Sequence, residues 1–302
     1  MNHKFQGSMT ALITPFDSNL EIDEVSLRSF VDYQIEKGSD ALVPCGTTGE
    51  SATMSHSEHQ KIIEIVIDQA NGRVPVIAGA GSNSTAEAIS LTKHAKDVGA
   101  NAVLSIVPYY NKPTHEGLIR HFRMIAEKVD IPIILYNIPS RTGQNMETKT
   151  IIKLSKIDNI VGIKEASGNI NQITNVILGT RDNPNFQVIS GDEDITVHVC
   201  ALGGVGVIGV AANIIPNRMS RFIDACLKNG NDDANTLHLE LYPFFKALFC
   251  ETNPGPVKFM ASKLKIAGIS NWYIRPPLVM PTEKNQIQIQ EVLQDLGIKS
   301  TN

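Results

Sequence analysis

The stretch NIVGIKEAS, residues 159–167, is largely aliphatic and carries a single lysine, Lys164. Such a run favours a buried strand, and strands that are apolar almost throughout are typical of a parallel sheet whose outer face is covered by helices. An unpaired ammonium group is costly to bury. A lysine in this stretch is therefore paired, or needed for its amine, or not buried as the pattern suggests. The stretch thus bears on both the fold and the chemistry.

Seven other segments share this composition and are bounded by Gly, Pro or Asp. They are MTALITPF (9–16), DALVPCG (40–46), PVIAGAG (75–81), AVLSIVP (102–108), PIILYNIP (132–139), FQVISGDE (186–193) and GVIGVAAN (206–213). Between them the apolar residues follow a helical spacing, at 57–70, 85–100, 115–129, 148–157 and 216–230. Eight strands alternating with helices predict an α/β fold of the closed (β/α)8 type, a TIM barrel.

The end of the chain has helical spacing without further strands. These helical segments lie near 234–250, 254–267 and 284–296. We therefore expect a catalytic barrel over residues 1–230 and a C-terminal helical region over residues 231–302. No low-complexity linker separates the two parts, which predicts that the helical region packs on the barrel.

Composition limits the classes of partner. The 302 residues carry a net charge of −4 and show no basic run, which argues against nucleic acid and anionic membranes. The four cysteines form no CxxC pair, as is typical of reduced thiols in a cytosolic protein. No apolar run is long enough to span a membrane, and the start MNHKFQGS lacks the apolar core of a signal peptide. We expect a soluble cytoplasmic protein that acts on small molecules.

Barrel enzymes carry their chemistry at the C-terminal ends of the strands. The residues there are hydroxyl-bearing, charged or small. They are Thr47 and Thr48 in CGTTGES, Tyr109 and Tyr110 in PYYNKP, Tyr136 and Arg141 in LYNIPSRTG, Lys164, Gly191 in SGDED, and Ile208.

Lys164 is the candidate nucleophile among them. Alternation along its strand puts Gly162 and Lys164 on one face and two aliphatic residues on the other, so we expect the lysine inside the barrel with Gly162 leaving room beneath it. Tyr136 ends the neighbouring strand within reach. Desolvation eases loss of the ammonium proton, as Schiff-base chemistry with a carbonyl substrate requires. The alternative is a surface lysine or one paired with Glu165, although alternation turns Glu165 away.

The neighbouring groups fit a keto acid. A phenol with a threonine hydroxyl behind it, Tyr136 with Thr47, can relay the protons of a carbinolamine. Arg141 can hold one carboxylate bidentately and the amides of GTTG can hold another. Each residue also has an ordinary interpretation, core packing for Tyr136 and a surface ion pair for Arg141. Their coincidence at neighbouring strand ends favours the catalytic one.

These residues resemble the dihydrodipicolinate synthase family, one of the pyruvate-dependent class I aldolase-like barrels, which also include N-acetylneuraminate lyase. The similarity covers most of the chain and runs through GSMTALITPF, GTTGES, AGAGSNSTAEAI, PYYNKPTHEG, YNIPSRTG, GIKEASGN, SGDED, GGVGVIGVAAN and ETNPGPVK. The second threonine, the tyrosine pair and the arginine match the synthases. The sialic acid lyases look more like GSTGE and lack that arginine.

The resemblance implies that pyruvate forms a Schiff base with Lys164 and, as an enamine, attacks L-aspartate 4-semialdehyde on the route to diaminopimelate and lysine. It implies a carbon–oxygen lyase without a separate cofactor or metal. Tyr136, Thr47 and Tyr110 match the proton relay of the family, in which Tyr110 is usually donated by the neighbouring subunit of a homotetramer, a dimer of dimers. The positions matched to substrate binding are Thr48, Arg141, Gly191 and Ile208.

The resemblance also concerns regulation. In members inhibited by lysine, a pocket at the dimer interface is lined by residues that match Ser51, Ala52, His56, His59, Asn83, Glu87 and Tyr109. From the residues alone, His56 and His59 in one first helical turn and Glu87 in another could meet a cationic amino acid, or could be ordinary solvated helix ends. We expect feedback inhibition by lysine.

Other patterns support other functions less well. Gly204, Gly206 and Gly209 spell GxGxxG, but at the start of a strand and without the acidic residue that a dinucleotide site needs. GDED (191–194) could bind a hard cation, but it lacks further oxygen ligands. Two alternatives stay open, another Schiff-base lyase or aldolase such as N-acetylneuraminate lyase, and a catalytically silent barrel that binds a small acid.

Overall fold

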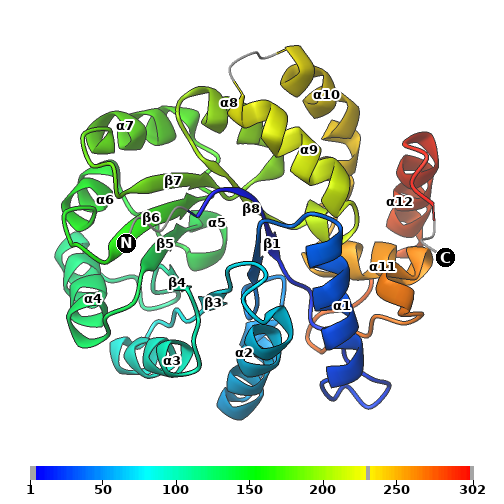
Figure 1. Cartoon of the computed structure of the whole chain (residues 1–302), viewed down its shortest axis with the longest axis horizontal. Helices are drawn as coiled ribbons and strands as arrows, with labels where there is room; N and C mark the ends of the chain where they lie inside the picture. The colour runs from blue at the N-terminus through cyan, green and yellow to red at the C-terminus, as the bar shows by residue number, and fades with distance from the viewer. Residues whose placement is uncertain (1–4, 229–231, 300–302) are drawn as a thin grey trace.

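The computed structural model describes residues 5–228 and 232–299, which form one parallel sheet rolled into a barrel with helices around it (Figure 1). The strands lie in the order β2-β1-β8-β7-β6-β5-β4-β3. A parallel bridge between Leu42 and Val76 joins β2 to the residues before β3 and closes the ring. The predicted TIM barrel is confirmed.

Every predicted strand is present, and each is shorter than the apolar stretch that predicted it. They are β1 (Gly7–Ala11), β2 (Ala41–Val43), β3 (Ile77–Gly79), β4 (Ala102–Ile106), β5 (Ile133–Asn137), β6 (Ile160–Glu165), β7 (Gln187–Ser190) and β8 (Gly206–Gly209). The apolar residues beyond the strand ends enter the loops at the C-terminal mouth of the barrel.

The helices expected from apolar spacing are present with shifted ends. They are α2 (His56–Ala70), α3 (Thr85–Asp97), α4 (His115–Lys128), α6 (Thr148–Leu154), α9 (Pro216–Leu227), α10 (Asp232–Ala247), α11 (Gly255–Leu264) and α12 (Glu283–Asp295). The helical and 3-10 segments that spacing did not single out are α1 (Glu24–Glu36), α5 (Pro139–Thr142), α7 (Ile170–Thr180), α8 (Thr196–Ala201), η1 (Ser51–Thr53), η2 (Glu193–Ile195), η3 (Ala211–Asn213) and η4 (Ile266–Gly268). Helix caps mark two of them, because Asp23 accepts from the N–H of Ser26 before α1 and Asn169 caps α7 in the same way.

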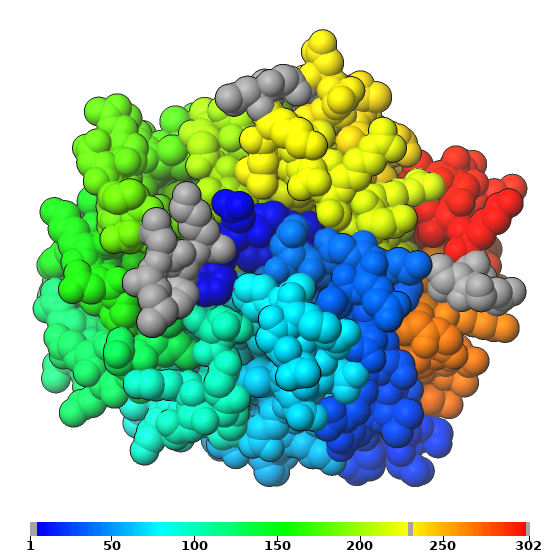
Figure 2. Space-filling model, in the orientation of Figure 1, coloured from blue at the N-terminus to red at the C-terminus, as the bar shows by residue number. Residues whose placement is uncertain are grey.

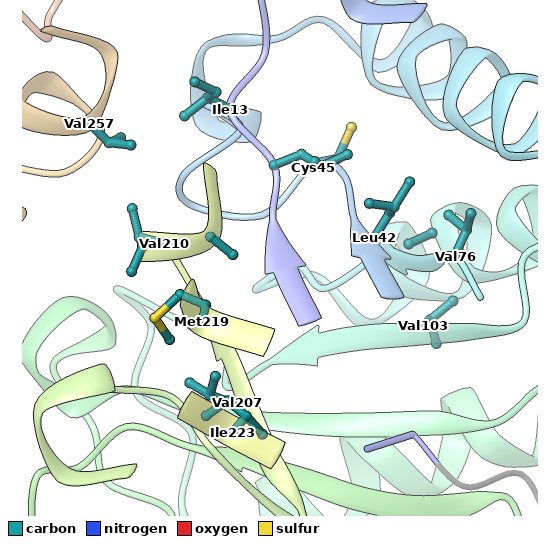
Figure 3. Packing of buried hydrophobic residues seen from close by; sticks show 14 of the residues in the cluster. Ile13, Leu42, Cys45, Val76, Val103, Val207, Val210, Met219, Ile223 and Val257 are labelled. Carbon is teal, nitrogen blue, oxygen red and sulfur yellow. The ribbon is translucent and has the colours of Figure 1, made fainter. Parts of the chain in front are cut away.

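The core has two layers because successive residues of a strand point to opposite faces. Ile208 of β8 packs inside the barrel with Met9 and Ile134, whereas Val207 packs in the outer layer between strands and helices. Figure 3 shows part of this outer layer, with Val207 close to Ile223 of α9. The inner layer is therefore a packed core that closes the barrel below the strand ends.

The alternation expected for β6 is wrong at Val161. The register slips between Ile133 and Ile134, so Ile160 pairs with Ile133 while Gly162 pairs with Ile134. Val161 is the extra residue of this bulge, and it packs against the inner cluster instead of the helices. We expected Gly162 to leave room below the lysine, and its contacts show a further role. A Cβ there would lie 2.7 Å from the carbonyl oxygen of Gln187, so the glycine allows β7 to approach closely.

The N-terminal end of the barrel is closed by the beginning of the described chain. Phe5 belongs to the inner cluster, and its backbone N–H donates to Gln187 Oε1 at 2.9 Å. The dark blue residues at the centre of the face in Figure 2 belong to this first part of the chain. Access to the barrel interior is therefore from the opposite, C-terminal end.

The C-terminal helices pack on one side of the barrel. α10 contacts α8 and α9, and α12 contacts α10 and α11 (Figure 1). Val257 of α11 lies near Val210 and Ile13 in Figure 3 and belongs to the outer layer. The predicted boundary between barrel and C-terminal region, at residues 230 and 231, lies outside the described residues. Among the described helices, none has the length and apolar character to cross a bilayer.

Candidate active site

Lys164 lies at the C-terminal end of β6 and points into the barrel. It is 7% exposed, its Cα pairs with that of Tyr136 on β5, and its Nζ lies 4.4 Å from the centre of the Tyr136 ring. Burial lowers the pKa of Lys164 to about 8, while the carboxylates of Glu193 and Asp192 oppose this shift and the Arg141 guanidinium adds to it. Much of the amine is therefore unprotonated in mildly basic solution.

Glu165 does not pair with the lysine, in agreement with the alternation expected there. Its carboxylate is buried on the helix-facing side, where it accepts hydrogen bonds from the Nδ2 of Asn137 at 3.1 Å and the backbone N–H of Ser167 at 2.8 Å. Burial raises the pKa of Glu165. Lys164 thus has an aromatic neighbour inside the barrel and no direct carboxylate partner among the described residues.

Tyr136 connects the lysine to the turn after β2. Its side chain is 6% exposed and shares a hydrogen bond with the hydroxyl of Thr47. Burial, which is the largest influence, and the carboxylate of Asp192 raise the pKa of the phenol, so Tyr136 keeps its proton at neutral pH. The phenol and hydroxyl together form a path by which a proton can move near the amine.

Thr48 and Arg141 lie at the same end of the barrel and meet one residue of the C-terminal region. Thr48 is 3% exposed and accepts a hydrogen bond from Nδ2 of Asn253 at 3.0 Å. The guanidinium of Arg141, which follows β5 in the short helix α5, donates to the backbone oxygen of Asn253 at 3.5 Å. The predicted carboxylate-binding residues are therefore together, and Asn253 is a neighbour that sequence reasoning missed.

Gly191 follows β7, and Ile208 lies on β8. The backbone N–H of Gly191 donates to the carbonyl of Glu165 at 2.8 Å, and a Cβ at Gly191 would lie 2.6 Å from that of Ala166. Ile208 is fully buried among the inner apolar residues. A glycine is thus required where β7 leaves the barrel next to the end of β6.

Tyr110 is not brought to the lysine within one chain. It is 90% exposed, has a φ of 71°, and does not line the cavity that holds Thr47 and Tyr136. A tyrosine held in a left-handed backbone conformation and projecting into solvent fits a residue offered to another molecule. Its assignment to the relay stays a prediction.

The cavity is about 590 Å³ and reaches from Thr47 and Tyr136 to the predicted regulatory residues. Thr47, Tyr136, Arg141 and Asn253 line one part of it. The predicted regulatory residues along its wall are Ser51, Ala52, His56, His59, Glu87 and Tyr109. Asn83 does not line it, but its side chain donates to the backbone oxygen of Tyr109 at 3.1 Å.

The regulatory candidates form a polar wall between α2 and α3. His56 Nε2 lies 2.6 Å from Glu87 Oε1, and the hydroxyl of Ser82 also bonds Glu87. The hydroxyl and the histidine lower the pKa of Glu87. His59 is 7% exposed, and burial lowers its pKa to about 4. At neutral pH this wall therefore presents an ionised carboxylate and an uncharged His59.

The comparison with protein families agrees with this geometry. A family model described as the dihydrodipicolinate synthetase family matches residues 4–296. The chain belongs to this family. The expected family membership is thus confirmed over nearly the whole chain.

Relatives from this family are similar to the chain along almost its full length. A 4-hydroxy-tetrahydrodipicolinate synthase of Syntrophus aciditrophicus is 50% identical over 294 residues, 97% of this chain and 99% of the relative. The structure of a dihydrodipicolinate synthase from Acinetobacter baumannii complexed with pyruvate is 42% identical and covers 98% of this chain and 100% of its own, with a TM-score of 0.94. A synthase structure from Cyanidioschyzon merolae with lysine bound is 39% identical, covers 97% and 99%, and has a TM-score of 0.92.

Glu193, like Asn253, lies near the candidate site although the sequence analysis did not single it out. It is 1% exposed, and its Oε1 accepts hydrogen bonds from the backbone N–H groups of Val210 and of Ala211, the latter at 2.7 Å. Its charge acts on Lys164. The position of GDED directly after a barrel strand could have indicated that Glu193 belongs to the site. The sequence analysis considered this loop only as a possible cation site, whereas Glu193 bonds backbone amides after β8.

The GxGxxG pattern has a structural explanation in this family member. Gly206 to Gly209 form β8, so the pattern does not open a helix. Gly206 has a φ of 139°, and a Cβ there would lie 2.2 Å from the carbonyl oxygen of Gly7. The glycine permits close pairing of β8 with β1.

Proposed function

We infer that the chain is a 4-hydroxy-tetrahydrodipicolinate synthase, a lyase of the EC 4.3.3.7 type. It condenses pyruvate with L-aspartate 4-semialdehyde in the biosynthesis of diaminopimelate and lysine. The observation that carries the inference is Lys164, a buried amine of lowered pKa beside Tyr136, in a chain that belongs to this family. The assignment of individual residues below is our proposal.

Lys164 is the nucleophile. Its free amine adds to C2 of pyruvate, and loss of water from the carbinolamine leaves an iminium ion. The phenol of Tyr136 supplies the proton that leaves with the water, and the hydrogen bond between Tyr136 and Thr47 connects it to a second hydroxyl. The hydroxyl of Thr48 and the amides of its turn hold the carboxylate of pyruvate, while Gly191 and Ile208 form the wall beside the adduct.

The second half of the reaction forms the carbon–carbon bond. Loss of a C3 proton converts the iminium ion to an enamine, whose C3 attacks the aldehyde carbon of the semialdehyde, and the new oxyanion takes up a proton. The substrate amine then attacks C2 and displaces Lys164, which closes the ring. Arg141 binds the semialdehyde carboxylate, for which its exposed guanidinium at the cavity mouth is suited.

Tyr110 completes the relay of a neighbouring subunit, so the active unit contains at least two chains, arranged as a homotetramer. The exposure and left-handed backbone of Tyr110 support this assignment. Lysine acts as a feedback inhibitor at the wall formed by His56, His59 and Glu87, and the lysine-bound relative supports this assignment. The carboxylate of Glu87 suits the ammonium groups of such a ligand.

Reductive trapping tests the proposed function. The protein is incubated with pyruvate and borohydride, and its peptides are analysed by mass spectrometry beside those of Lys164→Ala. We expect a reduced pyruvyl adduct on the peptide that holds Lys164 and none in the variant. Lys153→Ala is the matched control, because Lys153 is exposed and pairs with Glu116 on the surface. An adduct on another lysine, or none, contradicts the mechanism.

The aldehyde partner is tested separately, since other Schiff-base lyases would form the same adduct. Consumption of pyruvate is measured with L-aspartate 4-semialdehyde and with N-acetylmannosamine. We expect turnover with the semialdehyde only. Turnover with the sugar would instead identify an N-acetylneuraminate lyase.

A further inference from the structure

Asn253 comes from the C-terminal region and reaches into the active site. It is 4% exposed and lines the cavity together with Thr47 and Arg141. Its Nδ2 donates to Thr48 Oγ1 at 3.0 Å, and its backbone oxygen accepts from the guanidinium of Arg141 at 3.5 Å. One residue thus contacts both side chains to which we assign substrate carboxylates.

The direction of the hydrogen bond between Asn253 and Thr48 decides whether the Thr48 hydroxyl can donate to a ligand. Because Asn253 donates, one lone pair of the Thr48 oxygen is occupied and its O–H proton must point elsewhere. Among the described residues this is the one hydrogen bond of the Thr48 hydroxyl, and Oδ1 of Asn253 has no partner. A hydroxyl that is buried, fixed on its acceptor side and still able to donate is arranged to bind an anion. A carboxylate next to this hydroxyl is the ligand that fits.

The same C-terminal region holds the turn that carries Thr48. Glu50 forms an ion pair with Lys258 of α11 in which both side chains are fully buried, and Glu50 Oε2 accepts from the backbone N–H of Arg275 at 3.0 Å. The N–H of Glu50 donates to the carbonyl of Thr47 at 3.1 Å. The turn is therefore fixed at Thr48 and at Glu50 by residues more than two hundred positions away.

The cations that hold this turn share an aromatic partner. Lys258 Nζ lies 4.4 Å and the Arg275 guanidinium carbon 4.3 Å from the centre of the Phe16 ring. Lys258 also donates to the carbonyl of Tyr273 at 2.6 Å. Each member of the buried pair also bonds a backbone group, Lys258 the carbonyl of Tyr273 and Glu50 the N–H of Arg275, and this gives the turn a defined position.

We propose that Asn253 is a positioning residue of the active site, which orients the Thr48 hydroxyl so that its proton meets the carboxylate of pyruvate. The proposal rests on the proposed function. It extends the site from the barrel loops into the C-terminal region, whose α11 fixes the same turn through Lys258. Asn253 acts through Thr48 and takes no part in the proton transfers.

A double-mutant cycle tests the proposal. The KM for pyruvate and kcat are measured for Asn253→Ala, Thr48→Val and the double variant, and each protein's melting temperature is recorded. Asn253→Ala should raise the KM for pyruvate about fivefold, the effect of losing one neutral hydrogen bond, with little change in kcat. The double variant should be no worse than Thr48→Val, because the bond acts only through that hydroxyl.

Two further variants separate positioning from folding. Asn285→Ala is the control, since it removes a hydrogen bond of 2.6 Å to Glu251 in the same region without touching the cavity, and it should leave the KM unchanged. Asn253→Asp keeps the shape but replaces the donor with an acceptor. Thr48 should then give its proton to Asp, and the KM should rise more than in Asn253→Ala.

Each outcome has a separate meaning. Equal and additive losses in Asn253→Ala and Thr48→Val, or an Asn253→Asp variant with normal KM, would overturn the proposal. Failure of the unaltered protein to form the pyruvyl adduct at Lys164 would overturn the proposed function itself. Normal trapping in the unaltered protein with additive losses in the variants would refute the positioning role alone.

Discussion

The most direct consequence of burying Lys164 is the pH dependence of its reaction with pyruvate. Its pKa is lowered from the ordinary value of 10.5 to about 8, and burial is the largest cause. At pH 7 roughly a tenth of the amine is then unprotonated, about 300 times the fraction for a lysine in water, and the difference corresponds to about 3 kcal/mol. The amine is therefore available without a separate base.

The assay measures how fast the adduct forms. The protein is mixed briefly with a low concentration of pyruvate between pH 6 and pH 10 and quenched with borohydride, and the adduct is quantified by intact mass. The initial rate should rise tenfold per pH unit up to about pH 8 and level off above it. A rate that continues to climb in proportion to hydroxide up to pH 10 would refute the lowered pKa.

Glu193→Gln tests whether the charge of Glu193 acts on the pKa of Lys164. The carboxylate of Glu193 favours the ammonium form of Lys164 and so raises the pKa of the lysine. Removing that charge should move the midpoint of the rate profile to lower pH. A midpoint that moves upward would show that Glu193 does not act on the lysine through its charge.

The remaining predictions concern the regulatory wall and the strand packing. Glu87→Gln should weaken inhibition by lysine at least tenfold without changing kcat, because the ammonium of the inhibitor loses its ionised partner. The control is Glu64→Gln, because the Glu64 carboxylate pairs with His94 at 2.8 Å between the same two helices. Equal inhibition of the two variants would refute the site. Gly162→Ala should lower the free energy of unfolding by about 1–3 kcal/mol in urea titrations, because its Cβ would lie 2.7 Å from a backbone oxygen. Gly46→Ala is the control: a Cβ there meets no atom within 4 Å, so the free energy of unfolding should not change.

The barrel could be predicted from the sequence because each strand is an uninterrupted apolar run between turn residues. The helices were harder to predict. α1 and α7 were missed, although Asp23 and Asn169 provide capping signals at their first turns. Element type therefore follows from periodicity, and element ends depend on short capping patterns that periodicity does not reveal.

The candidate site was predictable where its residues stand at strand ends. Lys164, Tyr136 and Thr47 are brought together as expected, since topology places the ends of parallel strands at one mouth. Asn253 and Glu193 were not predicted. Asn253 belongs to the C-terminal region, and the strand–helix alternation does not predict which part of that region meets the strand ends. Glu193 lies in an acidic loop whose composition is equally typical of solvated surface.

The bulge in β6 explains why the lysine points into the barrel. Continued from the pair of Ile133 with Ile160, a regular register would place Lys164 beside Asn137, whose side chain bonds Glu165 on the helix-facing side. The one extra residue, Val161, shifts the pairing so that Lys164 stands beside Tyr136 instead. Because paired residues of parallel strands share a face, this single insertion moves the amine from the outer layer into the barrel. Deleting Val161 should therefore abolish trapping by pyruvate even in protein that still folds.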